Sequence, residues 1–246
     1  MAPASSTPEP ERAVLLTRPL EDSRRVAARL EAEGIPVEIW PLTRIVPCMS
    51  DLRLPPGTDG VLASSAHGVR AFAALTGRRD LPVLAVGART AEVARSLGFV
   101  AFEAGGDARA LADLARRSGL SHLFYPRGAE VSTDMAAALG PHPRLTEAVV
   151  YAAEETGAAP SPVAHALASG RIAAVAVWSR RAGEILARRL SPQGAPAMVA
   201  VSARAALALA EAGFADIVVA ERPDSAGMMA ALRAARARGA GGGTTS

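Results

Sequence analysis

The chain has 246 residues, half of them hydrophobic and 21% charged, which is enough for one or two domains with a sizeable core. All 27 basic residues are Arg, which excludes lysine Schiff-base chemistry and the lysine-dependent phosphate loop. The net charge of +3 comes without a dense cluster of basic residues, so we expect no nucleic-acid partner.

The ends of the chain and its cysteine content indicate a cytoplasmic protein. Residues 1–11 are rich in Pro, Ser and Ala, without the basic start and apolar run of a signal peptide, and residues 239–246 are rich in Gly. We expect both ends to be disordered tails. No apolar stretch is long enough to cross a bilayer, so we expect no membrane contact. Cys48 is the only cysteine, which fits a reducing compartment.

Between the tails, short apolar runs alternate with Ala-, Leu- and Arg-rich stretches of helical spacing that end in Gly. This alternation is typical of a parallel, doubly wound α/β sheet. We predict strands at residues 13–16, 60–63, 83–86, 123–125, 174–178, 198–201 and 217–220. Helices are predicted near residues 21–33, 66–75, 88–97, 203–212 and 225–236.

An internal repeat predicts that the chain contains two similar halves. Residues 86–91 match residues 201–206 at an offset of 115, and Gly98-Phe99 matches Gly213-Phe214 at the same offset. Ser64 and Gly68 likewise match Ser179 and Gly183. Each half is therefore expected to form a flavodoxin-like lobe with a parallel sheet.

Two extended runs, near residues 37–49 and 145–154, interrupt the alternation. We expect them to lie side by side as a two-stranded β hinge that joins the lobes, with a ligand cleft between the lobes. This arrangement predicts a discontinuous lobe 1, residues 12–41 plus 155–238, and a continuous lobe 2, residues 42–154.

Small hydroxyl residues, arginines and glycines recur where the predicted strands end. Backbone N–H groups at helix N-termini favour anions, and the planar Arg side chain suits carboxylates. Taken together, these positions suggest a site for a polyanionic ligand, although each Ser or Thr taken alone also fits a helix N-cap. The candidate ligand contacts are Thr17, Arg18, Ser64, Ser65, Gly87, Thr90, Arg127, Gly128, Ser179 and Ser202.

No residues with the spacing of a metal site are visible, because the four histidines are scattered along the chain. The Gly-x-Ser-x-Gly elbow and the Gly-x-Gly-x-x-Gly loop are also missing. Tyr151, one of only two tyrosines, lies on the second extended run and is either a half-buried strand aromatic or a functional side chain.

In order and spacing, a series of short segments resembles uroporphyrinogen-III synthases. These segments cover most of the chain between residues 12 and 236 and include Leu15–Pro19, Gly60–Val69, Leu84–Ala91, Leu123–Gly128, Val149–Tyr151, Val175–Ser179 and Ala220–Asp224.

The resemblance implies two α/β lobes joined by a β-ladder and an enzyme that needs no cofactor. It implies a lyase of haem biosynthesis that cyclises the linear tetrapyrrole hydroxymethylbilane, which carries eight carboxylates, to uroporphyrinogen III. Water is lost and ring D is inverted in this reaction. The resemblance also implies that Tyr151 acts as the acid and that Ser64, Ser65, Thr90, Ser179 and Ser202 contact the ligand. Arg204 and Ala205 depart from the threonines found in relatives, which puts the contacts of that turn in doubt.

A non-catalytic sensor or regulator with the same two lobes is the alternative. Such regulators usually carry an added DNA-binding segment, and the sequence leaves little room for one after the last predicted helix. We therefore expect the enzyme, as a monomer that makes transient contact with the preceding enzyme of its pathway.

Overall fold

The computed structural model describes residues 12–131 and 133–240, which form two compact units. The first unit combines the chain up to Arg44 with the chain from Glu155 onward, and the second unit is Ile45–Glu154. The predicted disorder of residues 1–11 and 241–246 falls outside the described residues. Helix α9 (Ser225–Ala240) extends two residues into the predicted C-terminal tail.

The first unit contains a five-stranded sheet in which all paired strands are parallel, in the order β11-β10-β9-β1-β2. Its central strands are short runs of buried apolar residues, as expected when helices cover both faces of a sheet. The strands are β1 (Ala13–Leu16), β2 (Val37–Ile39), β9 (Ile172–Val177), β10 (Ala197–Ala200) and β11 (Ile217–Val219).

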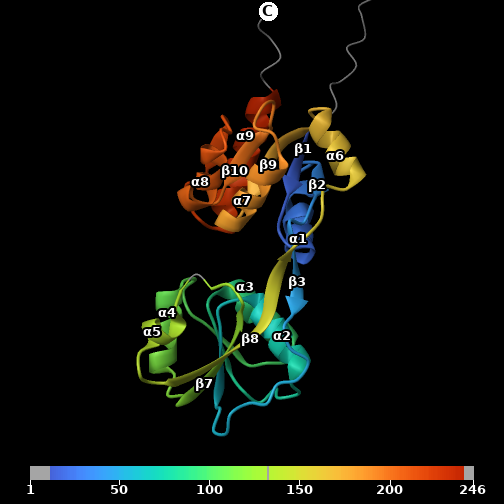
Figure 1. The fold of residues 1–246 in the computed structure, drawn as a ribbon. Coiled ribbons are helices and arrows are strands. Elements are labelled where there is room, and N and C mark those ends of the chain that lie inside the picture. The colour runs from blue at the N-terminus through green and yellow to red at the C-terminus, as the bar shows by residue number, and fades with distance from the viewer. Residues whose placement is uncertain (1–11, 132, 241–246) are drawn as a thin grey trace, which may run out of the picture. The chain divides into compact units, whose positions relative to one another are not determined.

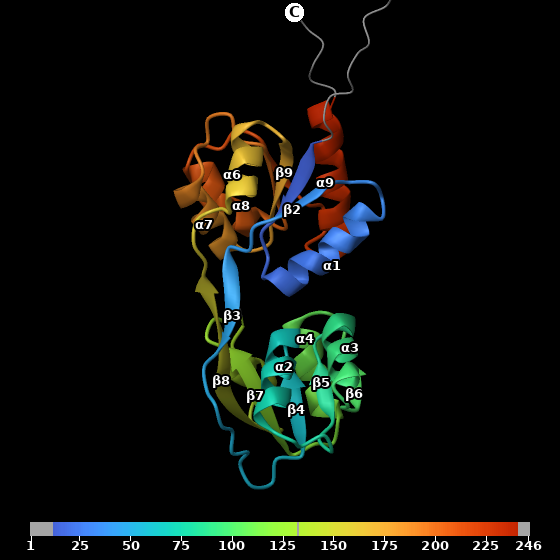
Figure 2. The same cartoon turned by 90° about the vertical axis from the view of Figure 1, so that its right-hand side faces the viewer.

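Successive side chains of β1 face opposite sides of this sheet and belong to two different hydrophobic clusters. Val14 and Leu16 pack with α1 (Leu20–Glu31) and α9, whereas Ala13 and Leu15 pack with the helices of the other face. Figure 2 shows α1 and α9 together on one side of the sheet. The helices on the other face are α6 (Ser161–Ala168), α7 (Arg180–Arg189) and α8 (Ala203–Glu211).

The second unit contains a six-stranded sheet in the order β3-β8-β7-β4-β5-β6, and helices cover both of its faces (Figure 1). Helices α2 (Ala66–Leu75) and α3 (Ala88–Ser96) pack on one face, and α4 (Ala108–Arg117) and α5 (Met135–Leu139) pack on the other. The strands are β3 (Thr43–Pro47), β4 (Gly60–Ala63), β5 (Val83–Ala85), β6 (Ala101–Glu103), β7 (His122–Gly128) and β8 (Arg144–Glu155). These two sheets confirm the predicted fold class of two α/β lobes with parallel sheets.

The 115-residue repeat corresponds to equivalent elements in the two units. Helices α3 and α8 are offset by this distance, and the strands before them, β5 and β10, are each second from the edge of their sheets. In sheet order, β6-β5-β4-β7-β8 corresponds to β11-β10-β9-β1-β2. The sheet of the first unit therefore matches five of the six strands of the second, but its last two strand positions are filled by the beginning of the chain.

The structure divides the extended run predicted near residues 37–49. Strand β2 pairs with β1 in the first unit, whereas β3 lies beside β8 at the edge of the second sheet. Pro41 lies between the two strands and has no N–H to donate to a ladder, which explains the break.

Candidate active site

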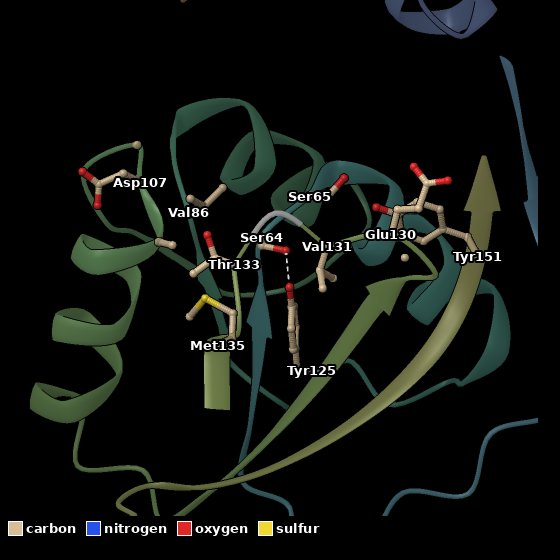
Figure 3. A pocket seen from close by; sticks show the side chains of 13 residues that line it. Ser64, Ser65, Val86, Asp107, Tyr125, Glu130, Val131, Thr133, Met135 and Tyr151 are labelled. Atoms are coloured by element: carbon tan, nitrogen blue, oxygen red, sulfur yellow. Dashed lines mark hydrogen bonds between the residues drawn. The ribbon is translucent and has the colours of Figure 1, made fainter. Parts of the chain in front are cut away.

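A pocket of about 510 Å³ lies in the second unit and is lined mainly by residues at or beyond the carboxyl ends of β4, β5 and β7, with Tyr151 from β8 (Figure 3). Parallel α/β sheets bind ligands at this edge because the strand-to-helix loops converge there. The pocket combines hydroxyl, carboxylate and apolar side chains. Its lining residues are Ser64, Ser65, Val86, Gly106, Asp107, Ala108, Tyr125, Gly128, Glu130, Val131, Thr133, Met135 and Tyr151.

Tyr151 is seated against two glycines that leave room for its ring. Gly128 lies opposite Tyr151 in the β7–β8 pairing, and a Cβ atom on Gly128 would lie 2.9 Å from the Tyr151 Cζ atom and 3.1 Å from its hydroxyl. A Cβ atom on Gly68 would lie 3.8 Å from the ring. The His67 ring packs at a centroid distance of 5.8 Å. The backbone of this site therefore fixes the position of the phenol.

The Tyr151 phenol is suited to donate a proton or a hydrogen bond. Burial raises its pKa above the ordinary value for tyrosine, and a hydrogen bond with Ser65 offsets part of this increase. The side chain therefore keeps its proton at neutral pH, as a general acid must.

Ser64 and Ser65, the two serines that follow β4, both line the pocket, and each has a partner in the protein. The Ser65 hydroxyl caps helix α2 by accepting a hydrogen bond from the backbone N–H of His67 at 3.1 Å. The Ser64 hydroxyl lies 2.7 Å from the Tyr125 hydroxyl. Ser65 therefore caps a helix and also lines the pocket, so the two roles predicted from the sequence, helix N-cap and ligand contact, are compatible for this residue.

Three other predicted contacts in the second unit do not line this pocket. Gly87 precedes α3 and packs near Gly106. A Cβ atom on Gly87 would lie 3.4 Å from the Cα atom of Gly106. Thr90 is buried in α3. Arg127 donates a hydrogen bond from Nε to Glu147 at 2.9 Å and another from Nη1 to the Gly128 carbonyl.

The four predicted contacts of the first unit each have a local structural partner. Ser179 and Ser202 cap α7 and α8 by accepting hydrogen bonds from backbone N–H groups. The buried Thr17 hydroxyl donates to the Ala176 carbonyl. Arg18 forms an ion pair with Asp22 at 3.1 Å and lies over the Trp178 ring at 4.8 Å. Asp22 is buried, whereas the Arg18 side chain remains partly exposed.

Several pocket residues are absent from the sequence-based candidates. Tyr125 lies two residues before Arg127 and three before Gly128, and this position next to two candidate residues is the signal that could have identified it. Asp107, Glu130 and Thr133 come from loops whose approach to the strand ends depends on the three-dimensional path of the chain.

The glycine beneath Tyr151 leads to a testable prediction. Gly128→Ala should lower turnover about tenfold, because the new methyl group must displace a ring whose position matters and a misplacement of about 1 Å can cost up to a hundredfold. Steady-state kinetics on the physiological substrate will measure the effect. Gly157→Ala is the control, because its Cβ atom would meet nothing within 4 Å. Equal turnover in the two variants would show that the ring position is unimportant.

Residues 12–131 and 133–240 contain no group of three or more His, Cys, Asp or Glu side chains arranged to hold a metal ion. No helix in this part of the chain is both long and apolar enough to cross a membrane.

Comparison with known proteins places the chain in a family. The family model for uroporphyrinogen-III synthase HemD matches residues 24–230, which is most of the chain. The chain belongs to the uroporphyrinogen-III synthase family. A search of curated proteins gives no match.

Solved structures of uroporphyrinogen-III synthases are similar to this member of the family. The enzyme from Helicobacter pylori 26695 has a TM-score of 0.65 and 15% identity, over 91% of this chain and 99% of the other. A mutant enzyme from the extremely thermophilic bacterium Thermus thermophilus has a TM-score of 0.49 and 18% identity, over 92% of this chain and 99% of the other. At these identities the first likeness supports the fold, and the family match identifies the protein class.

Proposed function

We propose that this chain is a uroporphyrinogen-III synthase, a lyase that cyclises hydroxymethylbilane to uroporphyrinogen III with loss of water and inversion of ring D. The family match over residues 24–230 carries this conclusion. The pocket supports it, because it offers a protonated phenol and hydroxyl groups at the carboxyl edge of a parallel sheet. The match also favours the enzyme over a non-catalytic regulator of the same fold.

Catalysis in this proposal depends mainly on geometry. Hydroxymethylbilane also closes without enzyme, to the isomer with ring D uninverted, so the protein must favour one of two ring closures rather than supply a strong nucleophile. Tyr151 donates a hydrogen bond or proton to the departing hydroxyl group. Ser64 and Ser65 hold the ligand so that ring D attacks through its substituted carbon.

The charges around the pocket limit how the ligand lies in it. Asp107 and Glu130 lie on opposite sides of the pocket, with Glu130 beside Tyr151, and each would repel a carboxylate of the substrate (Figure 3). Their oxygens can instead accept hydrogen bonds from pyrrole N–H groups. We propose that the substrate carboxylates are bound by hydroxyl groups such as that of Ser64, by the guanidinium groups of Arg18 and Arg127, and by backbone N–H groups at strand ends. The other predicted contacts, Thr17, Gly87, Thr90, Ser179 and Ser202, lie at these strand ends.

We further propose that the enzyme acts in the cytoplasm as a monomer, with transient contact to the enzyme that supplies its unstable substrate. The lone Cys48 fits a reducing compartment. Light scattering during size-exclusion chromatography will measure the mass of the particle.

The function is tested by supplying hydroxymethylbilane to the purified chain and separating the type I and type III products. We expect uroporphyrinogen III to form much faster than the spontaneous type I product. Type I alone, formed at the rate seen without protein, would contradict the proposed function.

A further inference from the structure

Both tyrosines of the chain lie on the same pocket, and each is hydrogen-bonded to one of two consecutive serines. Ser65 is the hydrogen-bond partner that lowers the pKa of Tyr151. Tyr125 pairs with Ser64 at a distance of 2.7 Å between the hydroxyl oxygens (Figure 3). The first pair contains the proposed acid. In the second pair Ser64 is a proposed ligand contact, whereas Tyr125 has no role in the mechanism described so far.

The ring of Tyr125 is held rigidly, although its hydroxyl reaches the pocket. Tyr125 lies within β7, is only 2% exposed, and belongs to a core cluster with Leu62, Leu84 and Met135. The pairing of Val61 with Phe124 sets β7 beside β4, so the Tyr125 side chain reaches the residue after the end of β4. Its hydroxyl is therefore a polar atom at a fixed position on the pocket wall.

Ser64, in contrast, is exposed at the end of its strand. A serine hydroxyl in such a position can rotate among several directions, and a hydrogen bond to a fixed partner selects one of them. A phenol is a stronger acid than an aliphatic alcohol, so the favoured arrangement has Tyr125 donating to the Ser64 oxygen. Burial also raises the pKa of Tyr125, which keeps this proton in place at neutral pH. The proton of Ser64 is then left to point at a ligand.

We propose that Tyr125 is a positioning residue that orients the Ser64 hydroxyl to donate a hydrogen bond to a carboxylate of the bound tetrapyrrole. This assignment rests on the proposed function for the identity of the ligand. Tyr125 acts through Ser64 and touches no reacting atom. Both serines are proposed ligand contacts, but their tyrosine partners differ in function: Ser65 pairs with the acid, and Ser64 pairs with a tyrosine that sets its direction.

The test is a double-mutant cycle with Tyr125→Phe, Ser64→Ala and the combined variant. Tyr125→Phe keeps the packed ring and removes only the hydroxyl. The readout is the Kd for uroporphyrin III, a stable and coloured tetrapyrrole with eight carboxylates, measured by quenching of tryptophan fluorescence. We expect Tyr125→Phe to weaken binding by about 2- to 10-fold, the range of one hydrogen bond, when Ser64 is present. In the Ser64→Ala background the same change should have no effect.

Two results would overturn the assignment, namely an unchanged Kd in Tyr125→Phe or an equal weakening in both backgrounds. Failure of the unchanged chain to bind uroporphyrin III would also overturn it. A merely structural Tyr125 would lower the midpoint of thermal unfolding without this dependence on Ser64. Binding is measured without turnover, so the two hypotheses fail in different experiments. The proposed function fails if the unchanged chain forms only type I product, and the binding cycle still tests the role of Tyr125 in that case.

Discussion

Tyr151→Phe is expected to lower the rate of uroporphyrinogen III formation about a hundredfold without unfolding the protein. General acids contribute about 10²- to 10⁴-fold, and the low end applies here because the substrate loses its hydroxyl group even without enzyme. The change removes one oxygen atom and leaves the ring packed against Gly128 and Gly68. Rapid oxidation and chromatographic separation of the two isomers will give the rate of each.

Two measurements separate a catalytic role from a structural one in this variant. The midpoint of thermal unfolding should change little, because the ring contacts with His67 and the glycines remain. The Kd for uroporphyrin III should also change little. Unchanged turnover would remove Tyr151 from the mechanism.

Gly68→Ala is expected to destabilise the second unit by about 1–2 kcal/mol. A Cβ atom on Gly68 would lie 2.3 Å from the carbonyl oxygen of Pro126, so α2 must move away from β7. Such overpacking costs about 1–3 kcal/mol, and the better helix propensity of Ala returns up to about 1 kcal/mol. Because the clash is with backbone, no side-chain rotation can relieve it.

Urea unfolding will measure this change, with Gly77→Ala as the matched control. A Cβ atom on Gly77 would meet nothing within 4 Å, so the control should unfold at about the same urea concentration as the unchanged chain. Equal stability of Gly68→Ala and the control would show that α2 can shift without cost.

The sequence repeat identifies Gly68 and Gly183 as equivalent positions, and the structure explains why both are glycine. Each lies in a helix that closely approaches a carbonyl group, from Pro126 in one case and from Ala205 in the other. The partners differ, because one helix packs on a strand and the other on the start of a helix. A repeat in the sequence can predict the shared requirement but not the neighbour, which depends on how the helices pack.

The candidate site is partly predictable for a similar reason. Ser64, Ser65, Gly128 and Tyr151 follow or lie on predicted strands, and the structure brings all four to one pocket.

Tyr125 could not be distinguished from a core aromatic, because its ring does belong to the core and only its hydroxyl reaches the pocket. Arg127 lies on the same strand but its side chain turns to Glu147. Whether each side chain reaches the pocket depends on its partners on neighbouring strands, Ser64 for Tyr125 and Glu147 for Arg127, and not on its proximity in sequence to the strand end.

The placement of β1 in the first sheet has a consequence for the order in which the protein folds during synthesis. Strand β1 lies between β2 and β9, and its Ala13 N–H donates to the carbonyl of Arg171, far along the chain. The N-terminal segment leaves the ribosome first, but its sheet stays incomplete until β9, β10 and β11 have been made. The second unit is contiguous and can close its own core before then. The second unit is therefore able to fold before the first, although β1 is synthesised before it. Until β9 is made, the hydrophobic strand β1 must avoid pairing with other strands.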